Sequence, residues 1–372
     1  QQPMSQTERH TVRLAFLGVG GRGSHLLDVT LQMDDVSVAA VCDLSEENRL
    51  HAQKAVESSG RERPRAYRDY TELFDEEGLD GVIIVTGWVP HVKIAKHAME
   101  RGVYAAFEVG PAGSVRECWD LVETHERTGV PCMLLENYCF HRDSMAVLNM
   151  VRQGVFGEIV HCECGYQHEL QERLVLGKGT GPKKKGTGDY RTIHNAKRNG
   201  DIYPTHGLGP IARMLNINRG NRFLSLTSTA SKARGLRDWV ENNLETDHPA
   251  ATRDWAKGDL ITTVIKCAAG ETVIVKHTTT IPAPMSRLGR VHGTRGVWSQ
   301  ESGKIHIQDK SPDHEWEPFE AYQAEYEHPL WREYLARGVK GGHGGGDFAV
   351  LRTLVESIKR GGAAPIDAYD AA

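Results

Sequence analysis

The sequence predicts an N-terminal α/β domain with a doubly wound parallel sheet, followed by a C-terminal α+β domain with a large, mostly antiparallel sheet. The chain has 372 residues, enough for two domains of about 150 residues each or slightly more. Over the first 150 residues, short apolar runs alternate with amphipathic stretches, as in parallel sheets buried on both faces. Beyond residue 155 the expected strands are longer and separated by turn signals. We expect domains at 1–150 and 151–340, with residues 340–372 packing back on the first.

The first domain is expected to alternate strands and helices. Its strands are predicted at Val12–Leu17, Val36–Cys42, Gly81–Thr86, Val103–Phe107 and Pro131–Leu135. A helix over His91–Glu100 starts after Pro90 and stops before Gly102, and a second, over Val115–Arg127, stops before Gly129. In the second domain we expect strands at Glu158–His168, Thr262–Cys267 and Thr272–Thr280. A glycine-rich loop at 177–188 carries Lys183–Lys185, most simply a solvated turn, and a helix over Phe348–Lys359 closes the chain.

Composition excludes several classes of protein. The 45 basic residues are balanced by 49 acidic ones, so a global basic field for nucleic acid is absent. No apolar run approaches the roughly 18 residues of a membrane helix, and the seven dispersed cysteines do not form a disulfide framework. We expect a soluble protein. No signal peptide is visible, but a chain beginning with Gln1 and Gln2 fits removal of a leader, so export and a cytoplasmic location both stay open.

A glycine-rich turn predicts a dinucleotide site. Residues 18–23 (GVGGRG) fit G-x-G-x-x-G, follow a predicted strand and open a predicted helix. Gly18 allows the tight turn, Gly20 lets backbone N–H groups approach the pyrophosphate, and Gly23 permits close helix–strand packing. Asp43 ends the next strand, 20 residues after Gly23, and would bind the ribose diol and repel a 2′-phosphate, which favours NAD over NADP. The simpler alternative is a structural turn. Arg22 could lie over the pyrophosphate or be exposed.

Other strand ends should line the same crevice, because ligands bind at the carboxyl ends of parallel strands. A generic loop residue is the alternative for each of them. The candidates are Thr86, Gly87, Trp88, His91, Glu108, Val109, Glu136 and Asn137.

The second domain holds acid–base candidates. Tyr203 and His206 are three residues apart at a helix start, with Pro204 in the first turn. The positive end of the helix dipole favours a neutral imidazole there. Tyr166 and His168 share one side of a strand, and His343 lies in a glycine-rich segment suited to a ligand. Ordinary packing, or a flexible loop at His343, is the competing reading.

The sequence predicts no metal site. Cys162 and Cys164 form a lone C-x-C, a poor zinc pattern without a second cysteine pair. On a strand, His161 would point to the face opposite the two cysteines.

The chain resembles the glucose–fructose oxidoreductase/inositol dehydrogenase superfamily and, more closely, glycoside hydrolase family 109, the NAD-dependent α-N-acetylgalactosaminidases. The resemblance spans residues 12–360, and its most specific segments are 117–122, 142–151, 165–168, 198–210, 215–220 and 342–345. It implies NAD contacts from Gly21, Arg22, Asp43, Trp88, His91, Glu108, Val109 and Asn137. It also implies sugar contacts from Tyr166, Arg191, Tyr203, Pro204, Thr205 and His206.

Two positions depart from these patterns. The wider superfamily commonly has Glu-Lys-Pro with an acid–base lysine, whereas residues 108–111 here are Glu-Val-Gly-Pro, which counts against a simple alcohol dehydrogenase. Met285 stands where the closer family usually has tyrosine, and a thioether cannot replace a phenol hydrogen bond. Sugar identity and anomer preference therefore stay open.

The resemblance implies an exo-acting glycosidase for a terminal N-acetylgalactosamine or related N-acetylhexosamine, on a glycan or a small molecule. The expected route is transient oxidation at C3, deprotonation at C2, elimination, water addition and re-reduction, instead of paired carboxylates. His206 or Tyr203 would be the first base, and Tyr166, His168 and His343 are further candidates. An NAD-dependent sugar or inositol dehydrogenase and a non-catalytic NAD-bound protein are the alternatives. By analogy we expect a homo-oligomer, with neither nucleic acid nor membrane as partner.

Overall fold

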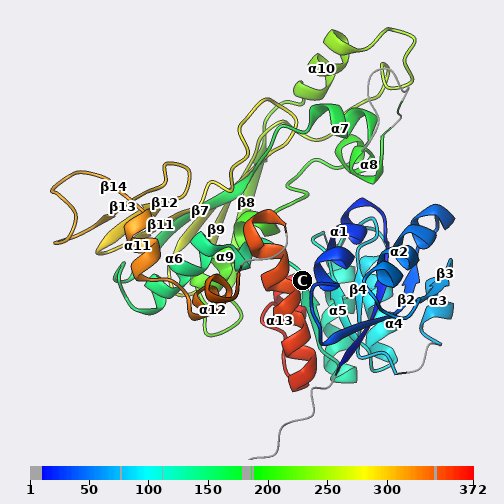
Figure 1. The fold of residues 1–372 in the computed structure, drawn as a ribbon. Helices are drawn as coiled ribbons and strands as arrows, with labels where there is room; N and C mark the ends of the chain where they lie inside the picture. The colour runs from blue at the N-terminus through cyan, green and yellow to red at the C-terminus, as the bar shows by residue number, and fades with distance from the viewer. Residues whose placement is uncertain (1–10, 76–77, 111, 178–185, 187, 339–341) are drawn as a thin grey trace, which may run out of the picture. The chain divides into compact units, whose positions relative to one another are not determined.

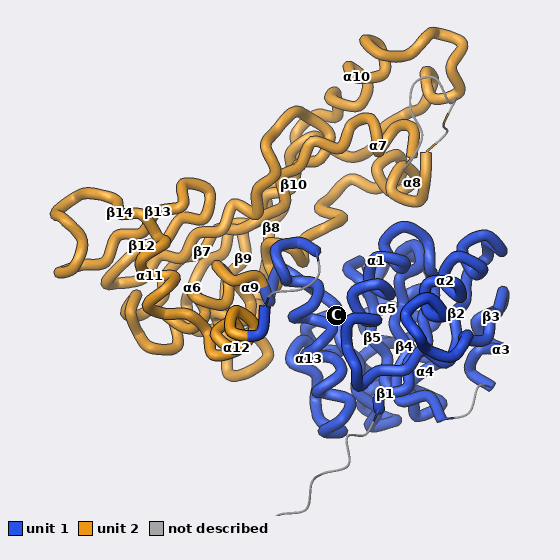
Figure 2. Tube along the Cα trace, in the orientation of Figure 1, with its two compact units in different colours: residues 1–140, 337–372 blue, residues 141–336 orange. Residues whose placement is uncertain are grey.

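The computed structural model describes residues 11–75, 78–110, 112–177, 186, 188–338 and 342–372 (Figure 1). Pro111, Lys183–Lys185 and most of the 177–188 segment lie outside these residues. The chain divides into two compact units, residues 1–140 with 337–372 and residues 141–336 (Figure 2). None of the described helices is long and apolar enough to cross a bilayer.

Unit 1 is built on a six-stranded parallel sheet. Its strands are β1 (Val12–Leu17), β2 (Val36–Cys42), β3 (Arg65–Tyr67), β4 (Gly81–Ile84), β5 (Tyr104–Phe107) and β6 (Cys132–Leu134). Their order is β3-β2-β1-β4-β5-β6, the doubly wound order of dinucleotide-binding folds. The connecting helices are α1 (Gly21–Thr30), α2 (Glu46–Ser58), α3 (Tyr70–Leu73), α4 (His91–Glu100) and α5 (Val115–Thr128), followed by the 3-10 helix η1 (Asn137–Phe140). The predicted fold class of this unit is confirmed.

The last part of the chain completes unit 1. It contains the 3-10 helix η3 (His343–Gly345), α13 (Gly346–Arg360) and α14 (Ala368–Ala371). Helix α13 packs against α1 and η1, and the Leu134 N–H on β6 donates to the Ile366 carbonyl at 3.0 Å. The boundary between the units falls at residue 140 instead of the expected 150, because helix α6 (Arg142–Arg152) packs on helices of unit 2.

Unit 2 is built on an eight-stranded mixed sheet in the order β14-β13-β12-β11-β7-β10-β9-β8. The strands are β7 (Ile159–Gln167), β8 (Phe223–Ala230), β9 (Ile261–Cys267), β10 (Thr272–Thr278), β11 (Arg290–Gly293), β12 (Gly296–Ser299), β13 (Lys304–Ile307) and β14 (Glu317–Pro318). Neighbouring strands are antiparallel except β7 and β10, which run parallel. The predicted α+β class is confirmed.

One face of this sheet carries the core of unit 2. Its apolar side chains pack against α6 and α9 (Thr205–Met214). The remaining helices are α7 (Gln171–Leu176), α8 (Tyr190–Lys197), α10 (Gly235–Asn243), α11 (Glu320–Glu325) and α12 (Pro329–Arg337). Cys162 and Cys164 point into this core, where burial raises the pKa of the Cys162 thiol to about 12 and that of Cys164 well above its ordinary value. All seven cysteines are free thiols.

Candidate functional site

The glycine-rich turn between β1 and α1 has the tight geometry that its sequence predicts. Gly18 has φ +85°, and a Cβ there would lie 2.7 Å from the Val85 carbonyl carbon. A Cβ on Gly23 would lie 1.8 Å from the Gly18 oxygen, so helix and strand approach too closely for any side chain. The nearest atom to a Cβ added at Gly20 is the Asn48 side-chain amide nitrogen, at 3.6 Å. The position before α1 therefore has room for a ligand.

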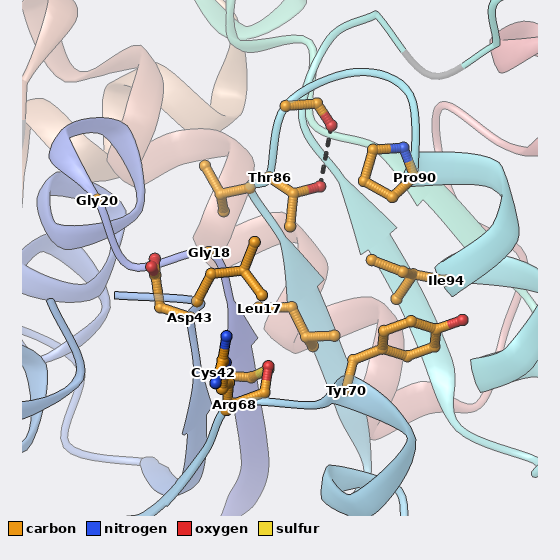
Figure 3. Close-up of a pocket in the computed structure, with 13 residues that line it drawn as sticks. Leu17, Gly18, Gly20, Cys42, Asp43, Arg68, Tyr70, Thr86, Pro90 and Ile94 are labelled. Atoms are coloured by element: carbon orange, nitrogen blue, oxygen red, sulfur yellow. Dashed lines mark hydrogen bonds between the residues drawn. The ribbon is translucent and has the colours of Figure 1, made fainter. Parts of the chain in front are cut away.

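A cavity of about 410 Å³ opens beside this turn (Figure 3). Its lining residues come from β1, β2, α3 and α4 and from the loops that follow β1, β2, β3 and β4: Leu17, Gly18, Gly20, Cys42, Asp43, Leu44, Arg68, Tyr70, Val85, Thr86, Gly87, Pro90 and Ile94. Leu17, Tyr70 and Ile94 give it an apolar wall. An apolar cavity beside a glycine turn and a helix N-terminus fits the base and the phosphates of a dinucleotide.

Asp43 is held firmly at the end of β2. Its Oδ2 accepts the Val19 N–H at 2.9 Å, and its Oδ1 accepts the Ser45 N–H at 2.9 Å and the Asn48 side-chain amide at 3.2 Å. A carboxylate offers about four acceptor positions. Asp43 therefore keeps capacity for one hydroxyl of a ribose while its orientation is fixed by the fold.

Arg22 connects the glycine turn to two carboxylates of unit 1. Its Nε donates to Glu108 at 2.7 Å, and its two terminal nitrogens donate to Asp347 at 2.8 and 2.9 Å. Asp347, in the first turn of α13, is fully buried and also accepts from Asn137 at 2.9 Å. Although burial opposes it, hydrogen bonds from His343 and Arg22 hold the pKa of Asp347 well below its usual range. The structure thus brings Arg22, Glu108 and Asn137 together.

Two histidines complete this cluster. Nε2 of His25 lies 2.9 Å and Nδ1 of His343 lies 2.7 Å from the same Asp347 oxygen. The hydrogen bond to Asp347 raises the pKa of His343. Candidate metal-binding atoms of these three residues lie within 4.8 Å of one another. Because Arg22 and Asn137 also occupy the Asp347 oxygens, the arrangement is that of an ion-pair cluster.

The other predicted residues of unit 1 lie at the expected strand ends but are largely covered. His91 is fully buried, its Nε2 lies 3.0 Å from the Thr86 carbonyl, and burial lowers its pKa to about 4, so it is neutral. Trp88 closes over Gly110, where a Cβ would lie 2.5 Å from the indole. Val109, at the position of the missing lysine, is 4% exposed.

Unit 2 gathers four of the five acid–base candidates. The ring centre of Tyr203 lies 4.9 Å from that of Tyr166 and 4.6 Å from that of His206. Tyr166 and His206 are 5.2 Å apart, and the Tyr166 hydroxyl lies 2.8 Å from Nδ1 of His168. Burial lowers the pKa of His168, which favours a neutral imidazole that accepts this hydrogen bond. The fifth candidate, His343, belongs to unit 1.

The other residues predicted to contact the sugar differ in how close they lie to this aromatic cluster. The Arg191 guanidinium, near the start of α8, lies 4.9 Å from the Tyr203 ring centre, at a cation–π distance. Pro204 caps α9 and Thr205 is its first residue, one position later than the first-turn proline that the sequence predicts. Met285 is 47% exposed in the segment between β10 and β11.

Sequence reasoning missed several polar residues that contact the predicted ones. Asp347 and His25 carried no signal, since their partners are far away in the chain. In unit 2, Asp201, Lys257 and His277 are also buried or nearly so behind the aromatic cluster. The Gly200-Asp201 pair beside Tyr203 was the available clue for one of them.

The fold and the two clusters define an enzyme class that joins a dinucleotide-binding domain to an α+β domain bearing acid–base groups. The profile described as an oxidoreductase family with an NAD-binding Rossmann fold matches residues 12–136, and that of the glycosyl hydrolase 109 C-terminal domain matches residues 140–372. The chain belongs to glycosyl hydrolase family 109. It is therefore a glycoside hydrolase with an NAD-binding Rossmann domain, as the sequence predicts.

Proteins of similar sequence align with nearly the whole chain. A glycosyl hydrolase family 109 protein of Stenotrophomonas maltophilia is 42% identical over 97% of this chain and 83% of its own length. A protein of Tannerella forsythia named alpha-N-acetylgalactosaminidase is 39% identical over 97% and 81%. Among solved structures, an NAD-binding oxidoreductase from Klebsiella pneumoniae (TM-score 0.70, 17% identity, 97% and 93% covered) and a levoglucosan dehydrogenase complex with NADH and levoglucosan (0.67, 18%, 97% and 93%) share the fold.

Proposed function

We propose that the chain hydrolyses terminal N-acetylgalactosamine, or a related N-acetylhexosamine, from glycosides while retaining NAD. The aromatic cluster of unit 2 carries the proposal, because it assembles two phenols and two imidazoles in a chain that also has a Rossmann domain. The name of the Tannerella forsythia relative supports the sugar. Such a set suits proton transfers next to a redox cofactor better than the carboxylate pair of most glycosidases.

The glycine turn and Asp43 would hold the cofactor. Gly18 and Gly23 would shape the turn, Gly20 and Gly21 would let the pyrophosphate approach the N-terminus of α1, and Asp43 would accept one ribose hydroxyl. Arg22, Trp88, His91, Glu108, Val109 and Asn137 would shape the remaining contacts. When bound, NAD supplies a reversible two-electron acceptor for the C3–H bond of the sugar.

The residues of the aromatic cluster would move the protons. His206 or Tyr203 accepts the proton of the C3 hydroxyl, since their rings are in contact and Arg191 places positive charge on the Tyr203 face. A ketone at C3 acidifies the C2 proton, which the Tyr166–His168 pair can take, because Tyr166 already bonds to Nδ1 of His168. The glycosidic oxygen would then leave from C1 with a proton and water would add across C1 and C2. Reversal of the C3 oxidation, with the hydroxyl proton returned by the same groups, would restore the sugar. His343, with its imidazole held by Asp347, is the remaining acid–base candidate.

Substrate choice is proposed to depend partly on residue 285. An exposed methionine there offers the sugar an apolar contact and no phenol hydrogen bond. We therefore expect the preferred sugar or anomer to differ from that of relatives with tyrosine. A Met285→Tyr variant tests this by comparing kcat/KM ratios for α- and β-linked N-acetylgalactosaminides and N-acetylglucosaminides; unchanged ratios would remove the residue from specificity.

The test is a screen of aryl α- and β-N-acetylhexosaminides in D₂O, with NAD-loaded and NAD-stripped protein. We expect aglycone release with deuterium at C2 of the product, only in the loaded protein. Full-speed cleavage by stripped protein would refute the proposal. NADH accumulation without aglycone release would indicate a sugar dehydrogenase, and NAD binding without turnover or exchange a non-catalytic protein. The expected homo-oligomer is a separate prediction, which light scattering checks.

A further inference from the structure

A buried histidine lies behind the ring of Tyr166. His277 is on β10, where it is the register partner of Tyr166 on β7, and its side chain is 1% exposed. The two ring centres are 6.2 Å apart, with 35° between their planes. Within the described part of the chain, neither imidazole nitrogen has a partner of hydrogen-bond geometry. Buried polar atoms are rarely left this way, so the position requires an explanation.

Asp201 connects this histidine to the second tyrosine. One of its oxygens, Oδ1, lies 3.2 Å from Nδ1 of His277 and accepts the backbone N–H of Tyr203 at 2.8 Å. Burial raises the pKa of Asp201 to about 6, although the Tyr203 N–H and Lys257 oppose that shift. A single carboxylate oxygen therefore lies between the backbone of one tyrosine and the imidazole behind the other.

Two cations face this pair. Lys257, 2% exposed in the segment before β9, donates to the Gly258 carbonyl at 3.2 Å and is attracted by Asp201 and Asp259; burial lowers its pKa to about 8. Arg191 approaches from α8. Burial first, and then these two cations, lower the pKa of His277 well below its ordinary value. His277 is consequently neutral, with one ring nitrogen able to accept a proton.

We propose that Asp201 and His277 are paired positioning residues, which hold Tyr203 and Tyr166 in their reactive arrangement, and that Asp201, once protonated, donates from Oδ1 to Nδ1 of His277. The inference rests on the proposed function, in which both tyrosines belong to the proton-transfer cluster. Ionised Asp201 holds the Tyr203 N–H through a charge-assisted bond. A proton taken from solvent neutralises the carboxyl, weakens that bond and turns the oxygen into a donor toward neutral His277.

The pair should be visible in the pH profile. We expect kcat to fall as the pH drops through about 6, because Tyr203 is held less firmly once Asp201 is protonated. KM should change little over this acid limb of the pH profile, the range in which kcat falls, since neither Asp201 nor His277 is placed against the sugar. A purely structural pair would affect stability without producing such a limb.

Asp201→Asn and His277→Phe test the pair. The asparagine oxygen still accepts the Tyr203 N–H but is neutral at every pH, so we expect kcat about tenfold lower at neutral pH, KM within about twofold, and no limb near pH 6. Phenylalanine keeps a ring against Tyr166 but has no nitrogen. In His277→Phe we therefore expect the midpoint of the fall in kcat at acid pH to shift. The matched control is Asp259→Asn, another buried carboxylate of unit 2, which accepts the Arg234 and Gly235 N–H groups. It should lower Tm and leave the limb in place.

A measurement without turnover separates this inference from the proposed function. In ¹⁵N-histidine NMR spectra, with His277 assigned through His277→Phe, its ring should stay neutral while Asp201 titrates, because burial, Lys257 and Arg191 lower the pKa of His277. Its signals should nevertheless shift with a midpoint near pH 6, and not in Asp201→Asn. If that midpoint appears but no glycoside is cleaved, the pair stands and the proposed function fails. A pH-independent His277 signal, or an unchanged acid limb in Asp201→Asn, overturns the pair.

Discussion

Arg22 and Asp347 are 325 residues apart in the sequence and form a two-bonded ion pair within unit 1. Arg22 is the second residue of α1, directly after the glycine turn beside the dinucleotide cavity, and Asp347 lies in the first turn of α13. The N–O distances are 2.8 and 2.9 Å, and the carboxylate has no solvent exposure. Helix α13 therefore helps to hold the segment that follows the glycine turn in place.

Asp347→Asn should destabilise unit 1 and weaken NAD retention. Removing one partner of a buried ion pair typically costs about 3–5 kcal/mol, and Arg22 would lose its anchor beside the turn. Denaturant unfolding and the NAD content of the purified protein measure the two effects. Asp35→Asn is the control, because Asp35 pairs with Arg352 and Lys359 farther along α13 at a partly exposed position. Asp35→Asn should lower the free energy of unfolding by less and leave the NAD content unchanged. Equal NAD loss in both variants would contradict a specific role of Asp347 beside the cofactor turn.

Alanine substitutions separate the structural and the binding roles of the fingerprint glycines. Gly20→Ala should fold with nearly unchanged Tm, since no atom lies within 3.6 Å of its Cβ, yet bind NAD at least about tenfold more weakly. Gly18→Ala should lose stability, because it combines φ +85° with a 2.7 Å contact to Val85. Gly60→Ala isolates the first of those two effects, since it has φ +81° and no neighbour within 4 Å. Calorimetry of unfolding and of NAD binding gives both quantities, and unaltered NAD affinity in Gly20→Ala would exclude a close backbone approach.

Asp43→Asn should reduce the preference for NAD over NADP. The carboxylate is held by Val19 and Ser45, so the amide can occupy the same place without its charge. We expect NAD affinity to fall about tenfold and NADP affinity to change less, because repulsion of the 2′-phosphate is removed. Isothermal titration with each dinucleotide measures the ratio. Asp28→Asn, at an exposed position of α1, should alter neither.

Sequence reasoning was most accurate where local pattern and buried environment coincide. The bounds of β1 and β2 match the predicted runs residue for residue, because strands covered on both faces are continuously apolar and end at Gly18 and Asp43. Strand β8 was not predicted, since six of its eight residues are exposed and four of the eight are polar. The short strands β11 to β14 also lack a distinguishable pattern.

The candidate sites, too, were predictable where a local sequence pattern marks them and not where distant segments meet. The glycine turn, Asp43 and the Tyr203–His206 spacing are local signals, and the structure brings the corresponding groups together. The position of His277 behind Tyr166 depends on the parallel register of β7 and β10, which are far apart in sequence. No short-range pattern contains that information.

Lys257→Met should change how stability depends on pH. In the folded protein the pKa of Lys257 is about 8 instead of 10.5, so between these values the unfolded chain binds more protons and stability rises with pH. The rise amounts to about 3 kcal/mol from that shift, and the variant should lack it. Denaturant midpoints measured across this range check the prediction. Lys266→Met, on an exposed residue of β9, should keep the rise; its loss there would rule out Lys257 as the source.

The return of the chain to its first domain has a consequence for biosynthesis. Asp347, α13 and α14 are translated only after the whole of unit 2, yet they supply the partner of Arg22 and a hydrogen bond to β6. A nascent polypeptide on the ribosome therefore carries a Rossmann sheet with an unfinished edge until these last segments emerge, and its Arg22 has Glu108 but not yet Asp347 as a partner. Cofactor capture should be a late, post-translational event in the maturation of this hydrolase.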